Sequence, residues 1–252
     1  MSVLNLLTRG ILGTRSTETR SPGPNDRSVR SRKRRIEVEN LERRELLSGN
    51  VTASVVDGDL VITGDSASNW IQVRQVSEKK FKITGISTTI NGRSSQTFTV
   101  ADDIRMNMKG GDDTVDVRGS GSSAAPGASR YLKIFGDLDI NTGSGHDTVI
   151  VKDVLVTDDV VIETGRGRDS VLLQTTYADD DVTVKKSNED SGDFNVVSLY
   201  DVWTDRNQNG GGTLTIDLLS GADNVSLYGV FAEEMQIRTR GGDDTLSMVL
   251  TR

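Results

Sequence analysis

The side chains best suited to chemistry in this sequence are aspartates that follow glycine-rich turns. They occur in GGDDTVDV, GSGHDTVIV, GRGRDSVLL, GADNVSL and GGDDTLSM, at Asp113, Asp147, Asp169, Asp223 and Asp244. Carboxylate oxygens are ligands that Ca²⁺ accepts in flexible geometry. Such aspartates either hold a ligand or only complete the turns. In the second case Gly supplies a positive φ, and Asp hydrogen-bonds local backbone N–H groups to form an Asx-type corner.

Two of these segments resemble a known calcium-binding family. Thr142–Ile150 (TGSGHDTVI) and Thr164–Leu172 (TGRGRDSVL) are similar to the RTX nonapeptide GGxGxDxUx, with Thr in place of the first Gly. The resemblance implies that Asp147 and Asp169 occupy the calcium-ligand position of that family, and the other three aspartates hold the same place in copies that have lost a Gly. RTX coils carry the nonapeptide twice in about eighteen residues. Here it occurs once in about 22 residues.

A second series of residues keeps a constant distance from the first. It consists of an acidic residue, or once Thr213, followed by alternating apolar positions. Its members are Asp59, Asp103, Asp137, Asp159, Asp181, Thr213 and Glu234. Ten residues separate each member from the Asp or Asn of the first series, except that Asp181 precedes Asn195 by fourteen. An irregular loop protein would not keep such an offset, so the two series indicate an internal repeat.

The elements that position these residues are short strands. Apolar residues alternate after each aspartate, so that Val149 and Val151 point to one face. One coil cannot bury that face alone, but stacked coils can. The sequence therefore predicts an all-β fold, a right-handed parallel β-helix (β-solenoid) with about 22 residues per coil. Insertions at 119–130 and 204–212 lengthen two coils, and a weak further coil is expected near Phe81–Ile83.

The chain divides into three parts by composition and pattern. Residues 1–49 are basic, with eleven Lys/Arg and six Asp/Glu, and we expect them to be largely disordered, with a short helix that starts near Ile36 and ends at Gly49. Residues 50–101 contain irregular first coils or a β cap, and residues 102–252 contain the repeats. The segment Leu41–Ser48 (LERRELLS) resembles the LEPR-XLL leader of exported bacterial proteins, with Arg43 in place of Pro. That resemblance implies an extracellular or cell-surface location.

Composition limits the classes of function. After residue 49 the chain has 19 Lys/Arg against 31 Asp/Glu, which argues against nucleic acid as a partner because phosphate contacts need cations. There is no cysteine and no apolar stretch of the roughly 18 residues that a membrane-spanning helix requires. The single histidine, His146, stands at a variable turn position, and no catalytic grouping accompanies it. We therefore predict that the protein is not an enzyme.

Stacking would place Asp137, Asp159 and Asp181 in one column. Like charges ~4.8 Å apart repel even in water. Either bound Ca²⁺ relieves this repulsion, or the carboxylates splay into solvent, where salt screens them. The sequence leaves both open. Of the two tryptophans, Trp70 is expected in the core or cap, and Trp203 packs beneath a loop or faces a glycan ligand.

These patterns favour a non-catalytic exported or cell-surface β-solenoid with a structural, adhesive or matrix role. The first alternative is a calcium-binding RTX-like module, and the second is a β-helix that binds or degrades an extracellular glycan. The last strand pattern, Leu246–Leu250, is followed by no recognisable cap. We expect self-association, or addition of a partner's strand, at that coil because an open edge exposes unpaired backbone groups.

Overall fold

The computed structural model describes residues 49–120, 130–187, 193–206 and 210–249. They belong to the second of two units into which the chain divides, Glu45–Arg252. The all-β class expected from the sequence is confirmed, since the described residues form nineteen strands and no helix. In particular, they include no helix that could cross a membrane. Residues 1–48 lie outside the described residues, and so does the expected helix except for its last residue, Gly49, which belongs to no helix or strand. Asn50 begins the first strand.

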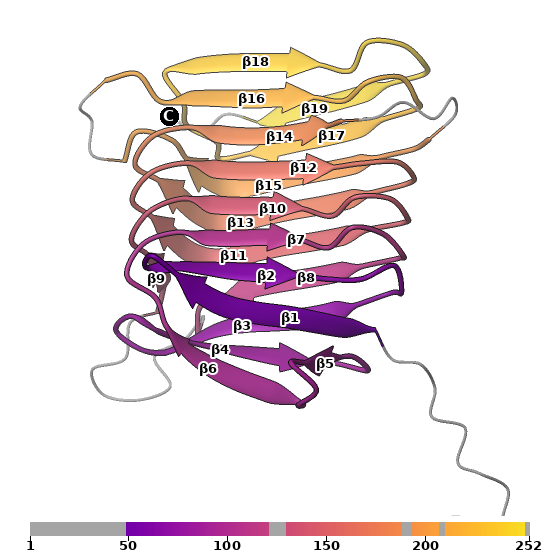
Figure 1. Ribbon diagram of the computed structural model, residues 1–252. Coiled ribbons are helices and arrows are strands. Elements are labelled where there is room, and N and C mark those ends of the chain that lie inside the picture. Colours follow the sequence, from indigo (N-terminus) through magenta and orange to yellow (C-terminus); the bar gives the residue numbers. More distant parts are fainter. Residues whose placement is uncertain (1–48, 121–129, 188–192, 207–209, 250–252) are drawn as a thin grey trace, which may run out of the picture. The chain divides into compact units, whose positions relative to one another are not determined.

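The strands form two sheets (Figure 1). The nine-stranded sheet has the order β18 (Glu234–Arg238), β16 (Thr213–Asp217), β14 (Val182–Lys186), β12 (Val160–Thr164), β10 (Leu138–Asn141), β7 (Ile104–Asn107), β2 (Asp59–Thr63), β1 (Asn50–Val56) and β5 (Thr89–Ile90). The ten-stranded sheet has the order β19 (Thr245–Val249), β17 (Asn224–Tyr228), β15 (Val196–Trp203), β13 (Ser170–Ala178), β11 (Thr148–Val156), β8 (Thr114–Arg118), β3 (Trp70–Ser77), β4 (Lys80–Gly85) and β6 (Ser95–Thr99), and β9 (Leu132–Ile134) pairs with β11.

From β7 onward the chain alternates between the sheets, except that β8 is followed by β9 of the same sheet. From β7 onward every strand pair within each sheet is parallel. We call a strand of the nine-stranded sheet, together with the next strand of the ten-stranded sheet, a rung. Within each sheet, matching residues of successive rungs pair directly: Leu138 with Val160, and Val160 with Val182. The two sequence series thus lie at equivalent positions of neighbouring strands, at the starts of strands in the two sheets.

The alternating apolar residues of both sheets form one core. Val149 and Val151 of β11 are fully buried, and Val171 and Leu173 lie directly beside them in β13. The outward residues between them are partly exposed, as the period of two requires. Trp70 is the exception to the expectation. It starts β3 on the outward face and is 45% exposed, so its predicted place in the core or cap is wrong.

Residues 50–101 combine parallel and antiparallel pairing. β2 and β3 join the parallel sheets beside β7 and β8. β1 pairs antiparallel with β2, and β4 pairs antiparallel with β3 and β6. The parallel coil expected near Phe81–Ile83 is therefore wrong, because β4 returns along β3 through a tight turn at Glu78 and Lys79 rather than continuing the alternation. Phe81 and Ile83 still face the core.

The glycines of the turns allow neighbouring rungs to approach closely. A Cβ placed on Gly165 would lie 1.6 Å from the carbonyl oxygen of Gly143, and one on Gly167 would lie 1.9 Å from that of Gly145. Gly167 also has a φ of 114°, which other residues rarely adopt. The glycines therefore set the turn geometry that brings each following aspartate next to its counterpart.

Candidate functional site

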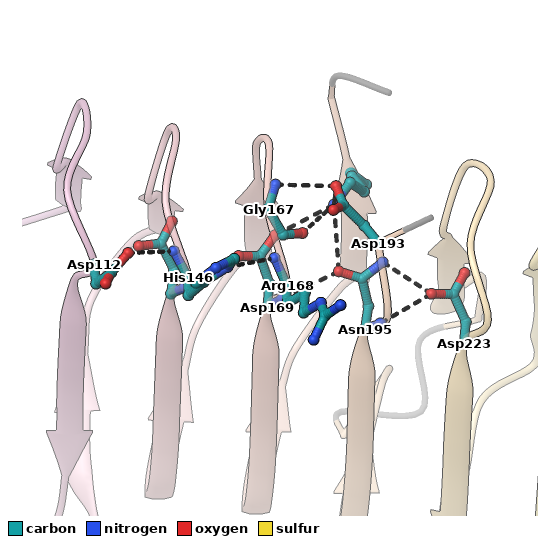
Figure 2. Close-up of polar contacts among 10 residues, drawn as sticks. Asp112, His146, Gly167, Arg168, Asp169, Asp193, Asn195 and Asp223 are labelled. Carbon is teal, nitrogen blue, oxygen red and sulfur yellow. Dashed lines mark hydrogen bonds and ion pairs between the residues drawn. The ribbon is translucent and has the colours of Figure 1, made fainter. Parts of the chain in front are cut away.

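The aspartates predicted as calcium ligands form, together with Asn69 and Asn195, one continuous row of hydrogen bonds, which we call the corner ladder. Figure 2 labels its members Asp169, Asn195 and Asp223. In the corner ladder, the backbone N–H of each residue donates to Oδ1 of its counterpart in the next rung. The bonds join Asn69 to Asp113 (2.7 Å), Asp113 to Asp147 (2.8 Å), Asp147 to Asp169 (3.1 Å), Asp169 to Asn195 (3.2 Å), Asn195 to Asp223 (3.1 Å) and Asp223 to Asp244 (3.0 Å). The expected local Asx-type corners are thus replaced by bonds between rungs.

Most carboxylates of the corner ladder are buried with one oxygen unpaired. Oδ2 accepts no hydrogen bond in Asp113, Asp147, Asp169 and Asp223. Burial raises the pKa of Asp113 to about 7, with a smaller contribution from the repulsion of Asp147. Burial also raises the pKa of Asp169 to about 6, against the opposing effects of a backbone hydrogen bond and of Lys186. These corners therefore favour protonated or otherwise neutralised acids.

Lys186 supplies the neutralising charge in one rung. It ends β14 beside Thr164 of β12, and its side chain is fully buried. Nζ donates to the carbonyl oxygen of Gly167 (2.6 Å), to Oδ2 of Asp193 (3.2 Å) and to Oδ1 of Asn195 (3.3 Å). It also lies 3.6 Å from Oδ2 of Asp169. Four oxygens from separate residues thus surround one buried ammonium group.

His146 belongs to an exposed row one residue before the corner ladder. Its backbone N–H donates to Oδ1 of Asp112 (2.8 Å), and its Nδ1 accepts the N–H of Arg168 (2.9 Å). Figure 2 shows this row running along the turns beside the buried one. The side chain of His146 thus continues the bonding pattern of the turns, and the contacts of the described residues place no nucleophile beside it.

The second series forms a second ladder of opposite direction. Here Oδ1 of each aspartate accepts the N–H of its counterpart in the following rung. The bonds join Asp103 to Asp59 (3.4 Å), Asp137 to Asp103 (2.8 Å), Asp159 to Asp137 (3.0 Å), Asp181 to Asp159 (2.9 Å) and Thr213 to Asp181 (2.7 Å), donor first. The carboxylates therefore do not splay freely into solvent. Partial burial raises the pKa of Asp159, helped by repulsion from Asp137 and Asp181 and opposed by the hydrogen bond from the N–H of Asp181.

The two ladders differ in whether three carboxylates come close enough together to hold a metal ion. No three of the predicted ligands bring carboxylate oxygens within 4.8 Å of one another in the described part of the chain. A group that does so is Asp59, Asp102 and Asp103, at the start of the second ladder. Arg105 pairs with Asp59 and Asp103, so the group already holds a counter-charge. Sequence reasoning missed this group because Asp102 belongs to neither series.

An aromatic row was also missed, apart from Trp203. The centroids of Tyr131 and Tyr177 lie 5.7 Å apart, those of Tyr177 and Trp203 6.1 Å, and those of Trp203 and Phe231 4.4 Å. Tyr131, Tyr177 and Trp203 line a cavity of about 270 Å³ with Leu155 and Arg206. Tyr131 and Leu155 also line a neighbouring cavity of about 550 Å³. Tyr177 and Trp203 lie side by side because they pair directly in β13 and β15. The four aromatic residues are unevenly spaced in the sequence, so the row was not recognised there.

No protein-family model, curated protein or solved structure matches this chain.

Proposed function

We propose that the chain is an exported or cell-surface β-solenoid with a structural, adhesive or matrix role and no catalytic activity. The finer architecture is a right-handed parallel β-helix of about 22 residues per coil. Support comes from strands that alternate between two parallel sheets and pair in register. The right-handed sense follows from the general preference of parallel crossover connections.

The observation that carries the non-catalytic role is the pair of aspartate ladders. The aspartates that the sequence offered as candidate ligands each use Oδ1 to accept a hydrogen bond from a backbone N–H of a neighbouring rung. A buried N–H without a partner is costly, so these acids replace a strand partner at the corners. Acids occupied in this way serve the fold, which is the behaviour expected of a structural module.

Export is supported by the LEPR-XLL-like segment Leu41–Ser48 and by the acidic body that follows it. The test is fractionation of bacteria that express the full chain, with detection in the medium, envelope and cytoplasm. We expect the chain outside the cytoplasm, and expect deletion of residues 36–48 to retain it inside. Cytoplasmic retention of the full chain in a host that exports other LEPR-XLL proteins would contradict this part of the proposal.

Calcium binding at Asp147 and Asp169, with Asp113, Asp223 and Asp244, remains the alternative. Calcium binding is favoured by the buried Oδ2 atoms that accept no hydrogen bond. It is weakened because, in the described residues, no three of these aspartates bring carboxylate oxygens within 4.8 Å of one another. Melting the chain in excess Ca²⁺ and in chelator separates the two functions. An ion that binds only the folded chain raises the melting midpoint, whereas a structural solenoid without an ion site melts equally in both.

Glycan binding is a second candidate, favoured by the aromatic row. Tyr131, Tyr177 and Trp203 present ring surface beside two adjoining cavities, and Arg206 adds donors at one end. Aromatic faces and polar donors together suit a sugar chain. A glycan array probed with the full chain and with Trp203→Ala tests this, since specific binding must depend on the ring.

We propose that a second copy of the chain, or a strand of a partner protein, adds to the sheets at β18 and β19. These strands are at the edges of their sheets, and Leu246, Met248 and Val249 are 40–52% exposed. Unpaired edge groups and apolar side chains favour strand addition there. Light scattering over a wide concentration range tests self-association, and a constant monomer mass would exclude it.

A further inference from the structure

Among the lysines and arginines that the structure describes, Lys186 is a buried one. Its counterpart in the preceding rung, Thr164, is a small polar residue, and the next rung carries no lysine there. A long cationic side chain in a core position is expensive unless oxygens satisfy it. The oxygens that accept hydrogen bonds from Nζ of Lys186 belong to one turn, 193–195, and to Gly167 of the preceding rung.

Asn195 is the member of the corner ladder that faces Lys186. Its Oδ1 accepts the N–H of Asp169 (3.2 Å) and Nζ of Lys186 (3.3 Å). Its Nδ2 donates to Oδ1 of Asp223 (2.8 Å). The carboxamide is therefore fixed from both sides. The amine of Lys186, this carboxamide and the carboxyl groups of Asp169, Asp193 and Asp223 meet at one corner. Figure 2 labels Asn195 together with these three aspartates.

We propose that Lys186 and Asn195 join through an intramolecular amide bond between Nζ and Cγ, with release of ammonia. The crosslink is a modification of the folded chain that holds β14 to the start of β15. It requires proximity, exclusion of water and a proton acceptor, all of which the corner contains. The proposal is independent of the function proposed above, because it needs neither export nor a ligand.

The atoms and charges balance without any further reactant. Nζ first gives one proton to the carboxylate of Asp169, 3.6 Å away. The lone pair of Nζ then attacks Cγ of Asn195, and the electrons of the carbonyl bond move to Oδ1, where the N–H of Asp169 stabilises the developing charge. Nδ2 takes the second proton lost by Nζ, and the Cγ–Nδ2 bond then breaks as the carbonyl re-forms. Ammonia leaves and takes up the proton held by Asp169, which restores the carboxylate and gives ammonium.

The surroundings favour each proton transfer. Burial raises the pKa of Asp169 to about 6, so that the acid can hold the proton that it receives and return it near neutral pH. Burial also raises the pKa of Asp223, which holds the departing nitrogen. Because Nζ of Lys186 already hydrogen-bonds to Oδ1 of the carboxamide that it attacks, the condensation is an intramolecular step, for which effective concentrations are very high.

Asn69 provides an internal comparison. It holds the equivalent place in the corner ladder, but its Nδ2 donates to Asp65 and to the carbonyl oxygen of Ala67. Its Oδ1 accepts the hydroxyl of Thr88. The carboxamide of Asn69 therefore contacts no amine in these bonds, and we expect it to remain unmodified.

The experiment is mass spectrometry of the purified full chain after incubation at neutral pH. We expect an intact mass lower than the sequence mass by one ammonia, and a protease-derived peptide pair joined at Lys186 and Asn195. A folded chain, shown by cooperative melting, that keeps its full mass would overturn the proposal without any variant. A succinimide at another asparagine gives the same mass loss, and the peptide map distinguishes it.

Two variants sharpen the result. Lys186→Arg keeps the cation but cannot form the amide, so the mass loss must disappear. Asp169→Asn removes the proton acceptor. Asn is tolerated in the corner ladder, since Asn69 and Asn195 already occupy it. We expect the crosslink to form at least tenfold more slowly, because general acid–base groups usually contribute at least that much. Unchanged mass loss in Lys186→Arg, or unchanged rate in folded Asp169→Asn, would overturn the assignment.

Discussion

The backbone N–H of Asp113 donates to Oδ1 of Asp147 at 2.8 Å, although 34 residues separate them. The bond occurs at a corner, where the chain leaves one sheet for the other. It therefore extends the ladder of hydrogen bonds beyond the strands. The cost is a buried carboxylate whose Oδ2 has no partner. Several measurable properties of the protein depend on that balance.

The first prediction concerns pH. The pKa of Asp113 is about 7 in the folded chain, against 3.8 for the ordinary group, so the folded state binds the proton more tightly. The stabilisation is complete below about pH 4 and is lost as pH rises through about 7. Asp169, with a folded pKa of about 6, adds an effect of the same sign. We expect a higher melting midpoint at pH 5 than at pH 8.

Asp113→Asn isolates the contribution of this carboxyl. Asn keeps an oxygen for the N–H of Asn69 and carries no charge, so we expect stabilisation on the order of 2 kcal/mol at pH 8 and little change at pH 4. Asp112→Asn is the matched control, because it removes the same charge from the exposed neighbour. Urea unfolding at both pH values measures the difference. Equal effects of the two substitutions would contradict the role given to burial.

Calcium is expected to leave stability unchanged. The carboxylates of the corner ladder already accept backbone donors, and they do not converge in threes. A bound ion at 100 times its dissociation constant would contribute about 2.7 kcal/mol. Calorimetric melting in Ca²⁺, Mg²⁺ and chelator measures this. A midpoint raised by Ca²⁺ alone, and restored to the chelator value in Asp147→Asn and Asp169→Asn, would favour the RTX-like function instead.

Close approach between turns predicts a severe effect for Gly165→Ala. The new Cβ would lie 1.6 Å from the carbonyl oxygen of Gly143. Because this oxygen belongs to the backbone, it can move away only if the rest of its rung moves with it. We expect destabilisation of about 2–4 kcal/mol. Gly92→Ala is the control, since its φ is 73° but a Cβ would meet nothing within 4 Å. Its cost should stay near 1 kcal/mol. Similar losses in both would show that steric approach is unimportant.

The aromatic row predicts a contrast between the two tryptophans. Trp203 packs against Phe231 with centroids 4.4 Å apart and ring planes tilted by 43°, so Trp203→Ala should cost about 2 kcal/mol. Trp70 is 45% exposed and belongs to none of the ring pairs of the described residues, so Trp70→Ala should change stability by less than about 0.5 kcal/mol. Chemical unfolding measures both. Equal losses would mean that the row adds nothing beyond ordinary burial.

The sequence by itself determined the β class and the positions that correspond between rungs. Both rest on local information, because a period of two decides which residues of a strand share a face. The constant offset between Asp137 and Asp147, repeated at Asp159 and Asp169, was enough to align strands that the structure pairs in register. The sequence left open whether β4 continues the coils or returns antiparallel in a cap, since an apolar alternation reads alike in either direction.

Only the tertiary structure decided what each side chain meets. Local pattern suggested that Asp147 caps its own turn, whereas stacking brings its Oδ1 to the N–H of Asp113 in another rung. Lys186 looks like an ordinary surface lysine in sequence, and becomes a buried amine beside Asn195 because β14 lies between β12 and β16. Hydrogen-bond partners, burial and pKa depend on residues distant in the chain. Local periodicity therefore specifies the strands and their faces, and the contacts of each side chain arise only when the strands stack.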